Sequence, residues 1–415
     1  MADAIDVAVV GGGPAGLAAA IKAKEAGAEH VTIIERGERL GGLLNQCIHN
    51  GFGLFYFNED LTGPEYARRF VEKAEGLKID TLLETMTLEI TQDKKVAVCN
   101  KDGYRFLEPK AVVLAMGCRE RTRQQILIPG YRPAGVLTAG TAQRMVNVDG
   151  CIPGKEIVIL GSGDIGMIMA RRLTLEGAHV KAVVEILPYC GGLIRNQVQC
   201  LQDFNVPLFL RHTVTWIHGR ERVEAVTIAE VDENLEPMLE TERVIGCDTL
   251  LLSVGLIPEN ELSLKAGVKL SPLTAGPVTN ERRETNVPGI FAGGNVVHVN
   301  DYVDRVSWEG EIAGQSAAEY AAKGAVTPKK RIDLEVGENI MYVVPQSISG
   351  EKELAVQMRV KEPREKVEIH IGDMVVKRFR AVAPAEMVTI DLTREQLKKL
   401  KEGTTELRIN CKTRR

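Results

Sequence analysis

The 415-residue sequence has eight cysteines, yet no two of them are spaced as C-x-x-C or C-x4-C. Those spacings are typical of redox dithiols and of zinc and iron–sulfur ligand sets. We therefore expect no such dithiol and no metal site, and we interpret the cysteines as mostly reduced packing residues. No run approaches the ~18 uninterrupted apolar residues of a membrane helix, so no membrane span is expected.

An excess of positive charge is also missing. Lys and Arg number 52 against 56 Asp and Glu, which gives a formal net charge of −4. Because nucleic-acid binding requires a basic surface, we expect no nucleic-acid partner. The first six residues include Asp3 and Asp6 and no Lys or Arg, so we expect no secretory signal and predict a cytoplasmic protein.

Glycine, by contrast, is abundant, with 40 residues, and part of it lies in a repeat. The first copy has the largely apolar run 5–10, the turn Gly-Gly-Gly-Pro-Ala-Gly at 11–16, an Ala-rich stretch up to Gly27, and the run 31–34 followed by Glu35. This order predicts a strand, a tight turn, a helix and a second strand with an acid at its end. The turn matches the G-x-G-x-x-G fingerprint of dinucleotide-binding βαβ units.

The same pattern returns between residues 157 and 185. The run 157–160 precedes the turn Gly-Ser-Gly-Asp-Ile-Gly at 161–166, a helix is predicted up to Gly177, and the strand 180–184 ends at Glu185. In both copies the acid follows the first glycine by 24 residues (35 − 11 and 185 − 161), and Gly-Gly-Leu follows at 41–43 and 191–193. Two fingerprints in register, each with a terminal acid, predict two dinucleotide-binding halves.

The residue types of each copy suit a bound dinucleotide. The first glycine permits the tight turn, the second lets the backbone approach a pyrophosphate, and the third lets the helix pack on the strand. The pyrophosphate lies at the helix N-terminus, where free N–H groups and the helix dipole attract its charge. Glu35 and Glu185 can accept hydrogen bonds from an adenosine ribose and would repel a 2′-phosphate, so we expect NAD rather than NADP at the second site. In the alternative interpretation, one or both turns merely pack a helix on a sheet.

Two such units in this order resemble the pyridine nucleotide-disulfide oxidoreductase superfamily, in which the N-terminal unit binds FAD and an inserted unit binds NAD(P)H. Residues 112–117 and 285–295 are similar to its two further motifs, at which the chain leaves the FAD domain and returns to the flavin. Residues 135–143, 161–166 and 174–177 resemble one branch, which includes the FAD subunits that accompany anaerobic glycerol-3-phosphate dehydrogenases and the flavin subunits of opine oxidases and hydrogen cyanide synthase.

The resemblance implies an α/β protein with two Rossmann-like domains, the second inserted in the first. It implies an FAD-binding domain formed by residues 1–118 and 251–326 and an NAD(P)-binding domain formed by residues 119–250. The residues expected to bind FAD are Gly11, Gly13, Pro14, Ala15, Gly16, Glu35, Arg36, Gly42, Leu43, Cys47, Ala115, Met116, Gly117, Gly294, Asn295 and Trp308. Those expected to bind NAD are Gly161, Gly163, Asp164, Ile165, Gly166, Glu185 and Gly255.

The sequence departs from the superfamily pattern in two respects. Disulfide reductases of the family carry C-x4-C after the Gly-Gly pair, whereas residues 41–49 contain Cys47 alone, and the C-x-x-C that thioredoxin-reductase-like enzymes place in the second unit is absent. Dithiol exchange within the chain is therefore not expected. Asn295 stands where the family has an Asp that bonds a ribityl hydroxyl. The carbonyl oxygen of Asn can accept the same bond, so we expect FAD binding to persist.

Cys47 and His49 lie in the segment that approaches the flavin in the family, and they are the candidate catalytic residues. In the functional interpretation, the thiol or the imidazole tunes the flavin or transfers protons. In the alternative, which we favour, Cys47 packs under the ring and His49 bonds a backbone carbonyl, because no second group identifies a proton path. Trp308 belongs to a predicted helix whose N-terminal end points at the flavin in the family, and core packing is its alternative role.

The glycine-rich α/β pattern ends near residue 331. Residues 354–360, 367–371, 387–392 and 406–411 alternate apolar and polar side chains, as half-buried strands do. They predict a small C-terminal β-sandwich-like domain over residues 332–415, which does not resemble the interface domain of glutathione-reductase-like enzymes. We expect this domain either to dock a partner subunit or to cap the FAD-binding domain.

Together these patterns predict an FAD-dependent oxidoreductase that passes hydride between NAD(H) and FAD. Because no redox dithiol is present, the other electron partner must be external: a partner redox subunit, of the iron–sulfur or dehydrogenase kind, or another acceptor or donor. Two alternatives stay open. One is an NADH oxidase or peroxidase that uses Cys47 as a sulfenic acid, and the other is a non-enzymatic assembly subunit that has lost one cofactor.

Overall fold

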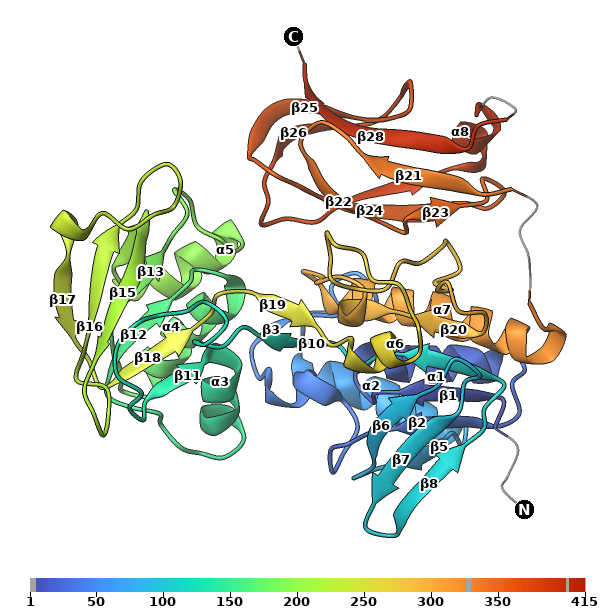
Figure 1. Cartoon of the computed structure of the whole chain (residues 1–415), viewed down its shortest axis with the longest axis horizontal. Coiled ribbons are helices and arrows are strands. Elements are labelled where there is room, and N and C mark those ends of the chain that lie inside the picture. Colours follow the sequence, from blue (N-terminus) through green and yellow to red (C-terminus); the bar gives the residue numbers. More distant parts are fainter. Residues whose placement is uncertain (1–4, 326–329, 401–402, 415) are drawn as a thin grey trace. The chain divides into compact units, whose positions relative to one another are not determined.

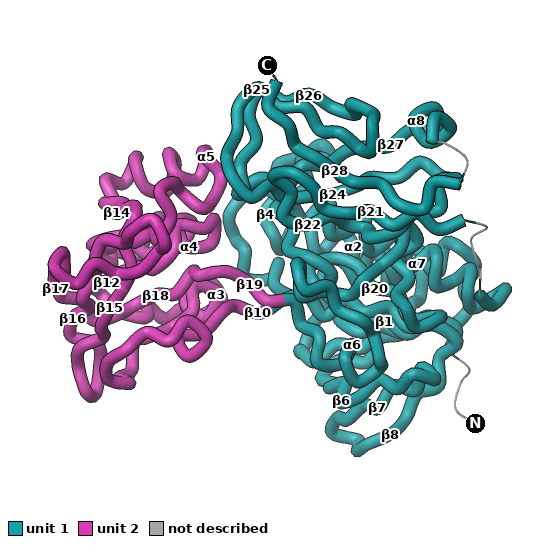
Figure 2. The backbone as a smooth tube through the Cα atoms, turned by 45° about the horizontal axis from the view of Figure 1, so that its top comes forward, with its two compact units in different colours: residues 1–118, 258–415 teal, residues 119–257 magenta. Residues whose placement is uncertain are grey.

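The computed structural model describes residues 5–325, 330–400 and 403–414. The chain forms two compact units, one made of residues 1–118 and 258–415 and the other of residues 119–257 (Figure 2). The second boundary differs from the predicted one at residue 251. Strand β18 (Thr249–Leu252) pairs with two strands of the inserted unit, so this unit continues to Ile257.

The first unit is built on a five-stranded parallel sheet (Figure 1). Its strand order is β20 (Ile290–Ala292), β9 (Ala111–Leu114), β1 (Val7–Val10), β2 (Val31–Ile34) and β5 (Asp80–Leu82). The first four strands are apolar, except for Thr32, and buried throughout, as expected for a parallel sheet that is covered on both faces. Because the strands are parallel, the turns that follow β20, β9, β1 and β2 all lie at one edge of the sheet.

Helices α1 (Pro14–Glu25), α2 (Gly63–Gly76) and α7 (Val303–Lys323) share one hydrophobic core with this sheet. Helices α1 and α7 pack closely: a Cβ added at Gly310 or Gly314 of α7 would lie 2.2 or 2.0 Å from the carbonyl oxygens of Ala15 and Ala19. Glycine is therefore required at these two positions of α7 for this contact.

The other face of the sheet shares a core cluster with the antiparallel strands β6 (Met86–Ile90), β7 (Val96–Asn100) and β8 (Gly103–Leu107). Smaller elements complete this part of the unit. They are η1 (Gly42–Gln46), β3 (Asn50–Phe52), β4 (Leu61–Thr62), α6 (Glu261–Lys265) and η4 (Gly294–Val296).

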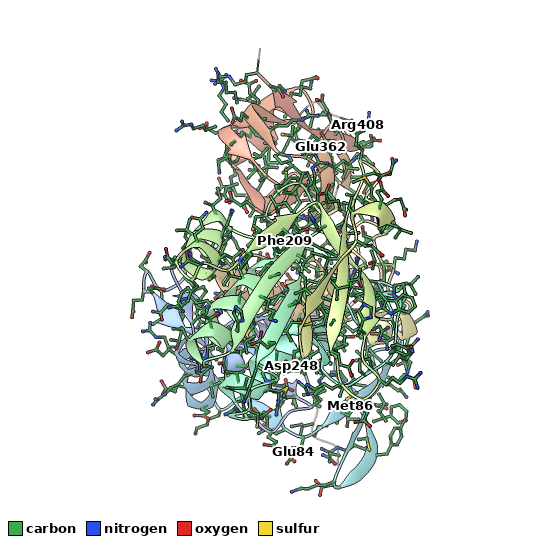
Figure 3. The ribbon with its side chains drawn as sticks, turned by 90° about the vertical axis from the view of Figure 1, so that its left-hand side faces the viewer. Glu84, Met86, Phe209, Asp248, Glu362 and Arg408 are labelled. Carbon is green, nitrogen blue, oxygen red and sulfur yellow. The ribbon has the colours of Figure 1, made fainter. Side chains whose placement is uncertain are left out.

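The second unit repeats this plan. Its parallel sheet has the order β11 (Val136–Thr138), β18, β12 (Glu156–Leu160), β13 (His179–Glu185) and β14 (Leu208–Leu210). In Figure 3, Phe209 marks β14 and Asp248 marks the residue before β18. The remaining elements are β10 (Cys118–Glu120), α3 (Ala139–Asn147), α4 (Asp164–Leu175), α5 (Ile194–Asn196), the π-helical turn η2 (Gln197–Gln202), β15 (His212–His218), β16 (Ala225–Glu230), η3 (Leu239–Thr241), β17 (Arg243–Gly246) and β19 (Leu256–Pro258).

The C-terminal part of the first unit forms a β-sandwich with one shared core. One sheet has the order β23 (Ser347–Ile348), β21 (Ile332–Val336), β28 (Glu406–Thr413), β25 (Arg364–Ile371) and β26 (Met374–Val382). The other has the order β22 (Ile340–Val344), β24 (Leu354–Val360) and β27 (Val388–Leu392), and α8 (Arg394–Lys398) follows β27. The predicted α/β class, with two Rossmann-like domains and a C-terminal β-rich domain, is confirmed.

In the part of the chain that the structure describes, no helix combines the length and the apolar character that crossing a membrane requires.

Candidate functional site

The first glycine turn follows β1, between the carboxyl ends of β9 and β2. Gly11 has a φ of +106°, and a Cβ there would lie 2.4 Å from the Ala115 carbonyl oxygen. A Cβ at Gly16 would lie 1.8 Å from the Gly11 carbonyl oxygen. Gly13 differs, because a Cβ there would meet only the Gly42 Cα, at 3.9 Å, beyond its chain neighbours. Two glycines thus close the turn, and the third leaves open space above it.

The N-terminus of α1 is suited to bind an anion. Gly13 is its N-cap, no side chain caps the helix, and its first turn contains no acid. Pro14 occupies the first helical position, where its missing N–H costs nothing. The unpaired N–H groups and the helix dipole therefore suit the pyrophosphate of a dinucleotide such as FAD.

Glu35 connects the end of β2 to this turn. One carboxylate oxygen accepts a hydrogen bond from the Gly12 N–H at 2.7 Å, and the other accepts one from the Gly37 N–H at 2.7 Å. Each oxygen keeps a lone pair that a ribose hydroxyl can use. Arg36 is exposed, and Leu43 is 62% exposed.

The late motif lies at the same edge of the sheet, after β20. A Cβ at Gly294 would lie 2.8 Å from the Ala15 Cβ, so this turn packs directly against the start of α1. Asn295 Oδ1 accepts a hydrogen bond from the Asn300 N–H at 3.0 Å, and its Nδ2 lies 3.7 Å from Cys118 Sγ. The oxygen that we expect to bind a ribityl hydroxyl thus holds its own loop and keeps one lone pair.

A buried charged cluster supports the Gly294 turn. Glu309 of α7 accepts hydrogen bonds from the Gly294 N–H at 2.8 Å and from His298 Nε2 at 2.7 Å, and it pairs with Arg283 at 3.2 Å. Burial would raise the pKa of Glu309, but Arg283 and His298 outweigh it and lower this pKa to about 2. Glu309 is not among the residues predicted from the sequence. No local sequence signal singles it out, because α7 also carries a second buried acid, Asp304.

Cys47 and His49 are both engaged with backbone carbonyls. Cys47 follows η1, is 7% exposed, and its Sγ lies 3.4 Å from the Leu43 carbonyl oxygen. His49 Nδ1 lies 2.9 Å from the Asn50 carbonyl oxygen, and its ring is 5.0 Å from that of Phe52. All eight cysteines lie in the described ranges, and none of them is joined in a disulfide.

Trp308 lies half-buried in α7, with its ring 6.0 Å from that of Tyr56 and the Arg305 guanidinium 4.8 Å from its centre. Asp304, in the first turn of the same helix, accepts hydrogen bonds from the N–H groups of Tyr56 at 2.7 Å and Phe55 at 3.2 Å. The segment that follows Cys47 is therefore hydrogen-bonded to α7. No local sequence pattern predicted this contact.

The second turn reproduces the geometry of the first. Gly161 has a φ of +99°, and a Cβ there would lie 2.1 Å from the Ser253 carbonyl oxygen. A Cβ at Gly166 would lie 2.6 Å from the Gly161 carbonyl oxygen, whereas Gly163 is open apart from Ser253 at 3.7 Å. The sequence Ser-Val-Gly at 253–255 thus occupies the place that Ala-Met-Gly at 115–117 has in the first unit.

The acid of the second repeat is more enclosed. Glu185 is 6% exposed; one oxygen accepts hydrogen bonds from the Ser162 N–H at 2.8 Å and Oγ at 2.6 Å, and the other accepts one from the Leu187 N–H at 2.9 Å. Asp164 stands in the first turn of α4, and its Oδ1 accepts hydrogen bonds from the Leu193 N–H and from Asn196 Nδ2. Ile165 packs on the core beneath this helix.

Within the described ranges, no group of three or more His, Cys, Asp or Glu side chains could hold a metal ion.

Comparison with known proteins gives one family. Residues 5–316 match the family described as pyridine nucleotide-disulphide oxidoreductase. An opine oxidase subunit of Agrobacterium tumefaciens is 27% identical over 315 residues, which cover 71% of this chain and 62% of that protein. Hydrogen cyanide synthase subunit HcnB of Pseudomonas protegens is 26% identical over 284 residues, which cover 63% and 58%. The chain thus spans less than two thirds of the length of these two relatives.

Two further proteins extend the comparison. The NADH oxidase of Methanocaldococcus jannaschii is 25% identical over 356 residues, which cover 74% of this chain and 75% of that protein. Among solved structures, the thioredoxin reductase of T. acidophilum aligns with a TM-score of 0.62 at 22% identity and covers 77% of this chain and 99% of that one. The structural match supports the fold and ends short of the whole chain.

Proposed function

Because the chain belongs to the pyridine nucleotide-disulphide oxidoreductase family, whose members use FAD and NAD(P)H, we propose that it is an NADH-specific flavoprotein that exchanges electrons with a partner outside the chain. The observation that carries this proposal is the pair of open glycine turns, each joined to an acid, in a chain without a closely spaced pair of cysteines. The family is shown by its match over residues 5–316, and the coenzyme preference and the partner are our proposals.

The first unit would hold FAD. The free N–H groups of α1 would bind the pyrophosphate, Glu35 the adenosine ribose, and Asn295 the ribityl chain. When bound, the flavin supplies hydride acceptance from a reduced nicotinamide and onward electron transfer. The protein contributes fixed positions: Glu309 stays charged at neutral pH because its pKa is about 2, and it holds the Gly294 turn against α1.

The second unit would hold NADH. Its turn leaves Gly163 open, and Glu185 presents a carboxylate at the end of β13. A 2′-phosphate next to this buried carboxylate would bring two negative charges together in a place with little water, which is strongly unfavourable. No Arg lies between Glu185 and Arg195 to compensate. The site therefore favours NADH over NADPH.

The electrons would leave through a partner rather than through thiols of this chain. A disulfide reductase needs two thiols within reach of each other, but no two of the eight cysteines have the C-x-x-C or C-x4-C spacing of a redox pair, and Cys47 is buried with its sulfur against the Leu43 carbonyl oxygen. Two relatives, one from an opine oxidase and one from a hydrogen cyanide synthase, are named as subunits of those enzymes, which supports an external partner here as well.

Anaerobic purification followed by titration tests the proposal. We expect a yellow protein whose flavin absorbance is bleached by stoichiometric NADH and not by equal NADPH. Reduced protein should pass electrons to a soluble dye or ferricyanide but not to a disulfide such as DTNB. A colourless preparation that stays colourless after incubation with FAD would refute the proposal, and equal bleaching by NADPH would refute its coenzyme preference.

A second candidate is an NADH oxidase that reduces oxygen directly. The relative of that name is matched over 74% of this chain and 75% of its own length. Oxygen consumption with NADH, measured in wild type and Cys47→Ser, separates the candidates. Fast turnover that is lost in the variant would favour a sulfenic-acid oxidase, whereas turnover that is slow and equal in both proteins favours an external partner.

A further inference from the structure

The C-terminal sandwich lies outside residues 5–316, so the family match gives it no role. In its strand β24, Val356, Met358 and Val360 belong to the sandwich core, and the intervening residues lie on the other face of the sheet. A half-buried strand leaves such polar residues in water. Gln357, however, is only 2% exposed, and the Arg359 side chain is 15% exposed. The polar face of β24 is buried against the sheet domain of the same unit.

Arg359 binds the segment that precedes α7. Its guanidinium donates to Asp301 Oδ1 and, at 3.3 Å, to the Val299 carbonyl oxygen. The second oxygen of Asp301 accepts the Met387 N–H at 2.6 Å. Both carboxylate oxygens of Asp301 are therefore held by the C-terminal sandwich. Within it, Arg359 also donates to the Tyr342 hydroxyl at 3.1 Å and to the Pro384 carbonyl oxygen at 2.9 Å.

Gln357 is linked through one intermediate residue, Asn300, to Asn295 at the edge of the sheet where β20 ends. Its Nε2 donates to Asn300 Oδ1 at 3.2 Å, and the Asn300 N–H donates to Asn295 Oδ1 at 3.0 Å. Its Oε1 accepts a hydrogen bond from Arg283 Nη2 at 3.0 Å, and Arg283 pairs with Glu309. Gln357 thus contacts both supports of the turn at Gly294 and Asn295, the amide network and the charged cluster.

Apolar contacts fix the sandwich in this place. Tyr342 and Val344 of β22 belong to the same buried cluster as Val10, Leu114 and Ile290 of the central sheet. Breaking a buried ion pair by removing one partner is costly, because it strands the other charge away from water. A domain that is docked by both apolar and ionic contacts keeps one orientation, so its contacts can position the loop that they touch.

We infer that the C-terminal sandwich is a positioning domain for the flavin site, in which Gln357 and Arg359 fix the segment 295–301 and so retain the ribityl chain of FAD. This inference rests on the proposed function, because it requires that the first unit holds FAD. In the structure, this segment follows β20 at the edge of the sheet where Gly11 and Glu35 also lie, and the turn at Gly294 packs on Ala15. Gln357 and Arg359 act through Asn295 and Asp301 and are not catalytic residues.

The cleanest test is Gln357→Met in the full-length protein. Methionine has nearly the same length and leaves no charge unpaired, since Arg283 still has Glu309. We expect the rate of FAD dissociation, followed by flavin fluorescence after dilution, to rise about three- to tenfold, as for the loss of a buried hydrogen bond. Arg359→Met should raise it more, at least about tenfold, because Asp301 loses its ion pair. The midpoint potential of the bound flavin should shift in both variants, and the apparent affinity for NADH should not.

Arg364→Met is the matched control. Arg364 lies in the same sandwich and pairs with Glu338 at 2.6 Å, away from β24's polar face. Its FAD dissociation rate should stay within about twofold of wild type, as expected for an exposed ion pair. Folded Gln357→Met and Arg359→Met proteins that keep the wild-type dissociation rate and potential would overturn the inference. If Arg359→Met does not fold, an unchanged Gln357→Met protein overturns it alone. A wild-type protein that binds no FAD refutes the proposed function itself, and the inference with it.

Discussion

The two dinucleotide-binding repeats share one backbone and differ in the charges around it. In both, two glycines are required by the close approach of a carbonyl oxygen, and a third leaves room for a ligand. At the first helical position, however, the first repeat has Pro14 and the second has Asp164. An acid at a helix N-terminus interacts favourably with the helix dipole and so competes with a bound pyrophosphate.

The acids that end the two repeats also differ in their exposure and in the number of hydrogen bonds that they accept. Glu35 accepts two backbone hydrogen bonds and is partly exposed, whereas Glu185 accepts three hydrogen bonds and is 6% exposed. The second site thus satisfies more of its own polar groups before a ligand arrives. This difference supports the proposal that the first repeat holds a cofactor that stays bound and the second a coenzyme that leaves after each turnover.

Replacing the first glycine of each repeat by alanine should weaken ligand binding most strongly. Gly11→Ala forces a side chain into a φ of +106° and within 2.4 Å of a carbonyl oxygen, and we expect FAD binding to be lost, by about 100-fold or more. Gly161→Ala should leave the flavin in place and abolish bleaching by NADH. The ratio of flavin to protein absorbance and an NADH titration measure the two effects.

The matched controls are Gly27→Ala and Gly177→Ala, which also have positive φ but meet no atom within 4 Å. They should cost some stability and leave both ligands bound. Loss of the flavin in Gly161→Ala would show that the two dinucleotide-binding repeats do not bind their ligands independently.

Acid should weaken the first unit more than the second. Glu309 has a pKa of about 2 when folded against an ordinary value of 4.5, so its stabilising effect is complete above about pH 4.5 and is lost as the pH falls toward 2. The loss amounts to roughly 3 kcal/mol in the free energy of unfolding. Trp308 reports on the first unit in a Trp216→Phe protein, and Trp216 reports on the second in Trp308→Phe, because the chain has two tryptophans.

Denaturant titrations at pH 6 and pH 3 compare the two reporters. Glu309→Gln, made in the Trp216→Phe protein, should remove most of the additional acid sensitivity. An equal shift of both transitions with pH would contradict the role given to Glu309.

Neutralising the enclosed acid should change coenzyme choice. In Glu185→Gln, the side-chain amide cannot accept all of the hydrogen bonds from Ser162 and Leu187 and also receive a ribose hydroxyl. We expect NADH affinity to fall about tenfold, equivalent to about 1.4 kcal/mol, and the preference over NADPH to narrow. Glu35→Gln is the counterpart and should weaken FAD retention without altering that preference. An unchanged ratio of NADH to NADPH affinities in Glu185→Gln would remove Glu185 from coenzyme selection.

Removing the negative charge at the start of α4 should strengthen NADH binding. Asn at position 164 can still accept the hydrogen bonds from Leu193 and Asn196, but it no longer repels a pyrophosphate. Asp164→Asn should bind NADH about two- to fivefold more tightly at low salt, and the gain should shrink as salt screens the charge. Glu176→Gln, at the other end of α4, is the control and should leave the affinity for NADH unchanged. Weaker binding in Asp164→Asn would indicate that Asp164 orders the site instead.

Much of the site could be predicted from sequence because its constraints are local. The glycine turns and the terminal acids are fixed by backbone sterics and by the length of one helix, so spacing alone identifies Gly11, Glu35, Gly161 and Glu185. The end of the inserted unit was misplaced for the opposite reason. Strand β18 is a short apolar run, and nothing in such a run specifies the sheet that it joins.

The residues that support the turn at Gly294 could not be predicted from sequence patterns. Arg283, His298 and Glu309 form one charged cluster, but they meet only because the segment before β20, the loop after β20 and α7 pack together. The alternation in β24 predicted a strand with its polar side in water, whereas the structure buries Gln357 and Arg359. Alternation shows that a strand has two faces and does not show what covers the second one.

The sequence by itself determined that this chain carries two dinucleotide turns, two acids at fixed distances from them and no closely spaced pair of cysteines. These are properties of short segments, in which each residue's neighbours along the chain set its conformation. Only the tertiary structure decided which charges are buried, which acid is enclosed, and that the C-terminal sandwich contacts the loop at residues 299–301. The physical reason is that burial and pairing depend on surfaces brought together from distant parts of the chain, and their cost or benefit exists only after that contact is made.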